Sequence, residues 1–213
     1  MPENSKTTIK TTLATKSANS KTTPKPPKIA PSPKTLGEKI RLLWLTFFYV
    51  GKSPFAPGTC GSLAALPFAI AVCVFLGIET LFLLSVLVFV ASIKPIDAFE
   101  RTAAHDLGLI VIDEVAGVFL SSALIAWAAQ GVGSGLGAFG FVLSFFLFRA
   151  FDILKPSIIG RVDKKVAGGL GVMGDDMLAG LFAGLLGAMI YGWLWKIGLL
   201  SWEWDLMKLR DLF

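Results

Sequence analysis

The chain has 213 residues, enough for one domain, and 54% of them are hydrophobic, with a mean hydropathy of +0.69. Only 16% are charged, so the composition excludes an ordinary soluble protein and indicates an integral membrane protein. The net charge of +5 does not indicate nucleic-acid binding, because seven of the lysines lie in residues 1–35 and no basic aromatic patch follows them.

The N-terminal stretch is predicted to be a tail outside the folded body. Residues 1–37 are rich in Lys, Thr, Ser and Pro and contain no aromatic residue, so they bury too little apolar surface to fold. They contain no apolar run typical of a secretory signal. We expect a disordered basic tail over 1–37, a helical membrane domain over 38–204 and a short C-terminal end over 205–213.

Apolar stretches follow the tail in order. Residues Leu42–Val50 are predicted to form an interfacial helix. Five longer stretches come next: Ser62–Gly77, Thr80–Ile93, Leu109–Ala129, Leu136–Phe151 and Met177–Leu200. The third and fifth reach the roughly 20 residues that span a bilayer, whereas the first two are short and are expected to form a re-entrant or tilted hairpin. The predicted fold class is an all-α, polytopic helical membrane bundle with four or five apolar helices.

The basic residues predict the orientation. Lysine and arginine occur before the first stretch, between the second and third, and between the fourth and fifth, but not in the turns at Glu79 and at residues 130–135. Because basic loops stay in the cytoplasm, the polar loops and the N-terminus are placed there. The two cysteines, Cys60 and Cys73, have no metal-site spacing and suggest no disulfide framework.

This orientation brings five carboxylates to the cytoplasmic membrane face, which is where the active site is predicted. They come from three apolar stretches: Asp113, Glu114, Asp152, Asp175 and Asp176. Such a cluster repels itself unless cations neutralise it, and carboxylate oxygens are the ligands that Mg²⁺ prefers. We therefore predict that these five residues are catalytic and bind Mg²⁺, which polarises a phosphoryl oxygen or holds a water for attack.

Groups suited to phosphate surround the acids. Arg149 precedes Asp152 by three residues and Lys155 follows it by three, so all three share a helix face if the helix continues. The segment GKSPFAPGTCGS supplies Lys52, Thr59 and glycines whose N–H groups can approach an anion. The glycine-rich segment AGGLGVMG before Asp175 is predicted to be a loop that flexes over a ligand.

Two rival interpretations remain open. Acids within a membrane protein also mark ion pathways, so the chain is alternatively an ion-binding transporter or a non-catalytic lipid-binding membrane protein. A transporter predicts acids at the bilayer midplane and internal repeats, and neither is apparent in the sequence.

Three blocks of the sequence resemble the phosphatidylglycerophosphatase A family. They are SPFAPGTCGSLAALP at 53–67, HDLGLIVIDEVAG at 105–117 and FRAFDILKPSIIGRVDKKVAGGLGVMGDDMLAG at 148–180. The resemblance extends from about residue 40 to residue 200. One departure is Leu107, where a proline commonly follows the HD pair in the family.

The resemblance implies an enzyme of the bacterial inner membrane that converts phosphatidylglycerophosphate to phosphatidylglycerol with Mg²⁺. By position, the family acids fall on Asp113 and Glu114, on Asp152 and on Asp175 and Asp176, and the family lysine and threonine fall on Lys155 and Thr59. Whether water or an aspartate attacks phosphorus stays open.

Overall fold

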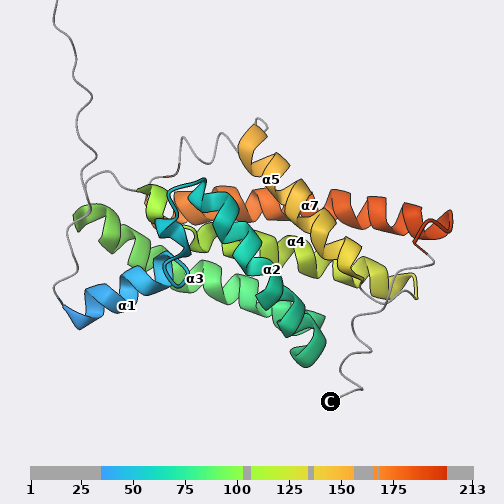
Figure 1. Cartoon of the computed structure of the whole chain (residues 1–213), viewed down its shortest axis with the longest axis horizontal. Coiled ribbons are helices and arrows are strands. Elements are labelled where there is room, and N and C mark those ends of the chain that lie inside the picture. The colour runs from blue at the N-terminus through green and yellow to red at the C-terminus, as the bar shows by residue number, and fades with distance from the viewer. Residues whose placement is uncertain (1–34, 103–106, 134–136, 156–165, 167, 201–213) are drawn as a thin grey trace, which may run out of the picture.

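The computed structural model describes residues 35–102, 107–133, 137–155, 166 and 168–200, and this part of the chain is helical without strands. Its helices are α1 (Leu36–Leu45), α2 (Pro57–Leu76), α3 (Ile78–Thr102), α4 (Ile112–Gly131), α5 (Ala138–Leu154) and α7 (Gly169–Lys196) (Figure 1). Short 3-10 turns precede α2 (η1, Val50–Lys52) and α4 (η2, Leu107–Leu109). The predicted all-α bundle is confirmed.

Some of the sequence predictions concern residues outside the described part. These are the tail as far as residue 34, the pair His105 and Asp106, the charged residues of 156–165, and the C-terminal end from residue 201. At the domain boundary, α1 begins at Leu36, two residues before the expected start at 38, because Thr35 caps the helix. The Thr35 hydroxyl accepts from the Glu38 N–H, and the Glu38 carboxylate accepts from the Thr35 N–H.

Within the residues that the structure describes, four helices are long and apolar enough to cross a membrane: α2, α3, α4 and α7. The expectation that the first two stretches are short is wrong. Helix α2 has 20 residues because it begins at Pro57 in the APGT segment, and α3 has 25 because it continues through Pro95 to Thr102. They meet at Gly77, whose φ of 93° ends α2. Helix α5 has 17 residues.

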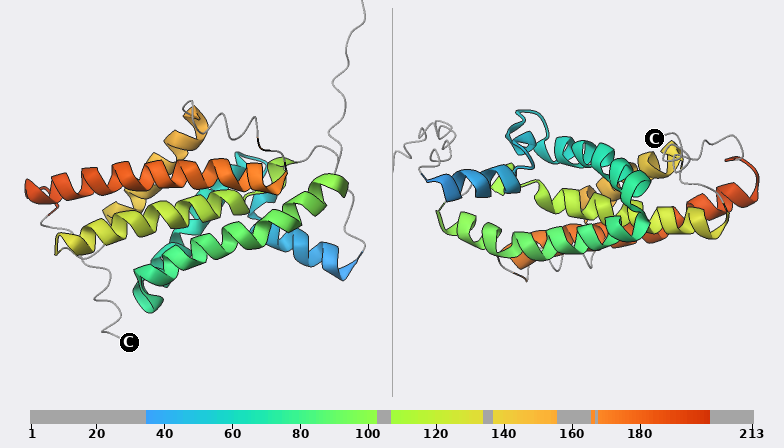
Figure 2. Two further views of the ribbon diagram at one scale, coloured as in Figure 1. Left: turned by 180° about the vertical axis from the view of Figure 1, so that it is seen from behind. Right: turned by 90° about the horizontal axis from the view of Figure 1, so that it is seen from below.

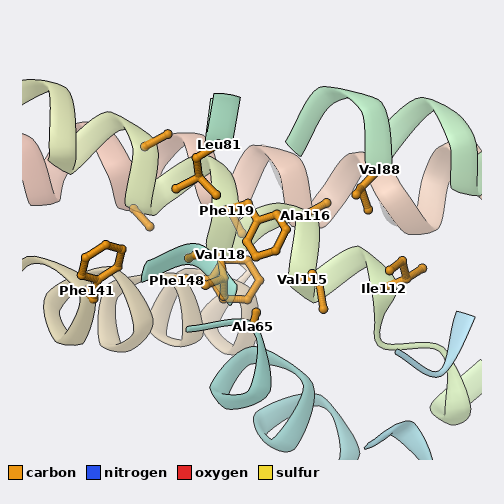
Figure 3. Packing of buried hydrophobic residues seen from close by; sticks show 14 of the residues in the cluster. Ala65, Leu81, Val88, Ile112, Val115, Ala116, Val118, Phe119, Phe141 and Phe148 are labelled. Atoms are coloured by element: carbon orange, nitrogen blue, oxygen red, sulfur yellow. The ribbon is translucent and has the colours of Figure 1, made fainter. Parts of the chain in front are cut away.

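Helix α4 is the centre of the bundle. In its apolar window 72% of the residues are buried inside the protein, against 28–33% for α2, α3 and α7. Figure 2 shows α3, α4 and α7 side by side, with α2 and α5 lying obliquely across them. The core therefore forms around α4, where Val115, Val118 and Phe119 meet Ala65 of α2 and Phe148 of α5 (Figure 3).

Glycines allow α4 and α7 to approach closely. A Cβ on Gly180 would lie 2.5 Å from the carbonyl oxygen of Gly117, and a Cβ on Gly117 would lie 2.8 Å from the carbonyl oxygen of Asp176. Farther along the same interface, Gly184 abuts Ser121 and Gly187 abuts Ile125, so the two helices run parallel. Small residues at such spacing are typical of membrane helix pairs, where close van der Waals packing replaces the hydrophobic driving force.

The bounds predicted for the interfacial helix, Leu42–Val50, are also wrong, because the helix in this region is α1, Leu36–Leu45. Helix α1 ends at Leu45, because Phe47, Phe48 and Tyr49 have φ values of 42°, 56° and 68°, which a right-handed helix cannot accommodate. The end of α1 is fixed to α3 by a hydrogen bond of 2.9 Å from the Trp44 indole to the Ser92 hydroxyl.

The glycine crossing predicts a specific sensitivity. Gly180→Ala should lower the free energy of unfolding by about 1–3 kcal/mol, because the added methyl group overpacks the α4–α7 contact. Gly192 lies on the same helix with nothing within 4 Å of its would-be Cβ, so Gly192→Ala is the matched control and should not destabilise. Thermal unfolding of both variants in detergent measures the difference, and equal losses would contradict the role assigned to the crossing.

Candidate functional site

A polar cavity of about 390 Å³ opens where α2, α4 and α7 begin and α5 ends. Eight of the nine predicted site residues line it: Thr59, Asp113, Glu114, Arg149, Asp152, Lys155, Asp175 and Asp176. The ninth, Lys52, is not in its wall. Its ammonium lies 4.4 Å from the ring centroid of Tyr49, a cation–π contact on the surface.

Arg149 links two of the acids. Its Nη1 lies 3.0 Å from Glu114 Oε2 and 2.8 Å from Asp152 Oδ2, and all three side chains are about 85% buried. The Ser62 hydroxyl donates to the same Glu114 oxygen at 2.8 Å and receives a long contact of 3.4 Å from Arg149. Charge-assisted bonds of this kind in a partly buried place fix the relative positions of α2, α4 and α5.

Lys155 forms an ion pair with a different acid from Asp152, the acid that its spacing in the sequence indicates. Helix α5 stops at Leu154, and Lys155 adopts a left-handed conformation with φ of 38° at the C-cap. Its side chain thereby leaves the face of Asp152 and reaches α7, where Nζ lies 2.6 Å from Asp175 Oδ2. The ion pair therefore joins the end of α5 to α7.

The prediction of a flexible loop before Asp175 is wrong for the residues from Gly169 onward, which are helical. Those residues are the first turn of α7, so Asp175 and Asp176 lie in its second turn and are each only 5% exposed. The first turn packs on α3, since a Cβ on Gly169 would clash with the carbonyl oxygen of Ile93. A rigid helix, rather than a mobile segment, presents these two acids to the cavity.

Asp113 and Asp176 face each other across the α4–α7 interface without a cation. Each lies one turn before a glycine of the close crossing, Gly117 or Gly180. Asp113 accepts a hydrogen bond of 3.0 Å from the N–H of Glu114, which is favourable at a helix N-terminus. Within the described residues no donor or cation contacts the Asp176 carboxylate, whose electrostatic neighbours are the other four acids.

The N-terminus of α2 adds unpaired donors to the cavity wall. Its N-cap is Ala56, which has no side-chain acceptor and adopts a left-handed conformation with φ of 40°. Pro57 has no N–H, and the N–H groups of Gly58 and Thr59 have no acceptor among the described residues. Such free N–H groups, together with the helix dipole, favour an anion.

Asp97 is a residue that sequence reasoning missed. It lies in α3 outside the cavity wall, and its Oδ1 accepts a hydrogen bond of 2.7 Å from the N–H of Gly169, the first residue of α7. The N-cap residue Gly168 offers no side chain, and its φ of 77° suits glycine. Asp97 thus caps α7 from another helix, and its sequence, near Lys94 and Arg101, carries no signal of this role.

The cavity suits a hard cation in chemistry and charge. Among the described residues, two cations face five carboxylates in the wall, so ionised acids would give these residues an excess of three negative charges. Asp113 and Asp176 are the acids that Arg149 and Lys155 do not contact. In the described part of the chain, no group of three or more Asp, Glu, His or Cys side chains is arranged to hold a metal ion by itself, so waters or substrate oxygens would have to supply further ligands. This open arrangement is compatible with Mg²⁺, which needs only one or two carboxylates and keeps several waters.

Comparison with known proteins gives a consistent set of relatives. The family model described as Phosphatidylglycerophosphatase A matches residues 43–191. A protein named phosphatidylglycerophosphatase A from Escherichia coli is 35% identical over 164 residues, covering 72% of this chain and 84% of the relative. A protein of the same name from Haemophilus influenzae is 35% identical over 143 residues, covering 65% of this chain and 81% of the relative.

A third relative carries a different name. It is a protein named putative phosphatidylinositol-3-phosphatase from Bacteroides thetaiotaomicron, which is 34% identical over 157 residues. The match covers 72% of this chain and 92% of the relative. No solved structure matches the chain significantly.

The capping contact generates a prediction about α7. Asp97→Ala should lower the free energy of unfolding by about 1 kcal/mol, because the N–H of Gly169 loses its acceptor. Asp97→Asn keeps an acceptor oxygen and should lose less. Thermal unfolding in detergent distinguishes them, with the exposed Glu79→Ala on the same helix as control. If alanine and asparagine at position 97 behave alike, the hydrogen bond does not stabilise α7.

Proposed function

The chain belongs to the phosphatidylglycerophosphatase A family, and from this premise we propose that it is an Mg²⁺-dependent phosphatase that converts phosphatidylglycerophosphate to phosphatidylglycerol. We place it in the inner membrane of a bacterium, with the cavity facing the cytoplasm. The observation that carries the proposal is the pairing, in one cavity, of an anion-binding side with an excess of carboxylates.

The anion-binding side is suited to a phosphomonoester. The free N–H groups of Gly58 and Thr59 and the side chains of Arg149 and Lys155 line the same cavity. Backbone donors at a helix N-terminus and a guanidinium together bind phosphate oxygens with directed hydrogen bonds. In this proposal the phosphate lies between the start of α2 and the end of α5, and the two cations neutralise its charge.

The opposite side is suited to the metal ion. Asp113 and Asp176 would hold it, and Asp152, Asp175 and Glu114 line the same cavity. When bound, Mg²⁺ would polarise a phosphoryl oxygen and offset the repulsion between the phosphate and the carboxylates. The residues support this assignment because oxygen ligands alone are present in the cavity wall as described, without histidine or cysteine.

The reaction requires attack on phosphorus and departure of the glycerol oxygen. In one route, water attacks phosphorus while a carboxylate accepts its proton, the P–O bond to the lipid glycerol breaks, and the glycerol oxygen takes up a proton to leave as the hydroxyl group of the product, with inorganic phosphate as the other product. In the other, an aspartate oxygen attacks phosphorus first and displaces the glycerol oxygen, which takes up a proton and leaves as a hydroxyl group, and water then hydrolyses the aspartyl phosphate to inorganic phosphate and the free aspartate. Asp113 and Asp176 are the acids that no cation of the described residues contacts, so one of them would fill either role while the other holds the metal ion.

The position of the acids disfavours the transport alternative. Asp113 is the second residue of α4, Asp176 lies in the second turn of α7 and Asp152 is in the last turn of α5, so all lie at one end of their helices. A carrier site is expected near the middle of its spans, at the interface of structural repeats. A cavity at one end is instead accessible to a lipid phosphate at the membrane surface.

Activity measurement tests the proposal. Purified protein should release inorganic phosphate from phosphatidylglycerophosphate in mixed micelles, chelation of divalent cations should stop the release, and Mg²⁺ should restore it. Asp176→Asn should lower kcat by about 10²-fold or more, because it removes an acid that contacts the reacting groups. Glu79→Gln, an exposed acid in the first turn of α3, is the control and should keep full activity. Equal rates for both variants would remove Asp176 from the site.

A second prediction concerns sidedness. With Cys60 and Cys73 replaced by serine, Gly108→Cys reports the cavity end, and Val132→Cys reports the opposite end of α4. A membrane-impermeant maleimide should label position 108 only from the cytoplasmic side and position 132 only from the other side. Labelling of position 108 from the outer side alone would contradict a cytoplasmic site.

A further inference from the structure

Three large apolar side chains adjoin the cavity and are almost fully exposed. Phe55 is 80% exposed, Leu154 is 78% exposed and Ile153 is 69% exposed. Each is next in sequence to a residue of the cavity wall: Phe55 precedes Ala56, and Ile153 and Leu154 lie between Asp152 and Lys155. We call Phe55, Ile153 and Leu154 the collar.

The collar occupies both sides of the cavity. Phe55 precedes the start of α2, whose first residues supply the free N–H donors, and Ile153 and Leu154 end α5, which supplies Arg149 and Lys155. The two helices are held together here by the bond network of Ser62, Glu114 and Arg149. The apolar residues therefore flank the anion-binding side of the cavity.

These residues contrast with their neighbours in polarity. Near the collar, the carboxylates of Asp152 and Asp175 are paired with cations and are mostly buried. The three collar side chains are exposed instead. Leaving three such side chains in water is unfavourable, and contiguous exposed apolar surface marks a contact with another molecule or with a membrane.

Aromatic and basic groups at the same end identify the environment. Tyr49 is 42% exposed and lies under the Lys52 ammonium, shortly before the start of α2. Tyrosine and lysine with an apolar body and a polar tip are typical of the bilayer–water boundary. The cavity end thus has the chemistry of that boundary rather than of a surface in bulk water.

We propose that the collar is inserted at the boundary between lipid headgroups and acyl chains, so that a lipid phosphate enters the cavity sideways from the bilayer. This proposal rests on the proposed function and adds the route and the partner, which is the lipid surface itself. The substrate keeps its acyl chains among the collar residues while its phosphomonoester reaches Arg149, Lys155 and the N-terminus of α2. The lipid does not leave the membrane to react.

Fluorescence tests the position of the collar without any activity. In a background lacking Cys60 and Cys73, Phe55→Cys and Leu154→Cys are labelled with an environment-sensitive fluorophore and reconstituted in vesicles of phosphatidylglycerol and phosphatidylethanolamine. Both labels should show blue-shifted emission, and quenchers attached high on the acyl chain should quench them. Leu87→Cys, 62% exposed within α3, is the reference for the bilayer interior, and the fluorophore in buffer is the reference for water.

Two outcomes overturn the position of the collar, and a third separates it from the proposed function. Water-like emission places the collar outside the membrane. Blue-shifted emission that lipid quenchers do not reach means that a second copy of the chain or another protein covers the collar. If the wild type fails to hydrolyse phosphatidylglycerophosphate while the labels report lipid contact, the proposed function fails but the membrane contact stands. The two failures are therefore distinguishable.

Kinetics test the route of the substrate. Phe55→Ser and Leu154→Ser should raise the apparent KM for the lipid in vesicles about fivefold or more, with little change in kcat, because each removes apolar contact with the bilayer. Hydrolysis of the deacylated, water-soluble phosphomonoester should be unchanged. The control is Leu76→Ser, which is 63% exposed at the far end of α2. Equal losses on the lipid and the soluble substrate would show a structural role and overturn lateral entry.

Discussion

The close approach of α4 and α7 is the constraint on which the site depends. At Gly117 and Gly180 the two backbones lie so near each other that a methyl group on Gly180 would come within 2.5 Å of a carbonyl oxygen. One helical turn toward the N-terminus of each helix lie Asp113 and Asp176. A helix pair separated by ordinary side chains would hold these acids several ångströms farther apart. The glycines therefore determine how close the carboxylates of Asp113 and Asp176 lie to each other.

The remaining charges divide the cavity into two sides. Arg149 of α5 and Lys155 at the C-cap of α5 contact Glu114, Asp152 and Asp175. Asp113 and Asp176 at the α4–α7 interface have no cation among the described residues. An anion is favoured where the cations and the free N–H groups of α2 lie, and a cation is favoured at the opposite side. This asymmetry is the basis of the proposal that a phosphoryl group and a metal ion occupy adjacent places in the cavity.

The helices also hold the site rigidly. Asp97 of α3 caps α7, Ser62 of α2 donates to Glu114 of α4, and Lys155 ties α5 to α7, so every helix that surrounds the cavity is joined to another by a polar contact. Such contacts are strong in an apolar environment, where an unpaired polar group has no water to replace its partner. The charged residues that line the cavity are consequently held in place by contacts between helices.

The sequence by itself determined the fold class, because the length of an apolar stretch and the placement of charges are local properties of the chain. It also predicted nine residues for the site, and eight of them line the cavity. It also placed the acids at one end of their helices. Only the tertiary structure decided that the segment before Asp175 is a helical turn, that α2 and α3 are full-length helices, that Lys155 pairs with Asp175, and that Asp97 caps α7. Each of these depends on a contact between residues far apart in the chain or on one backbone torsion, such as the left-handed Lys155, and neither changes hydropathy or spacing.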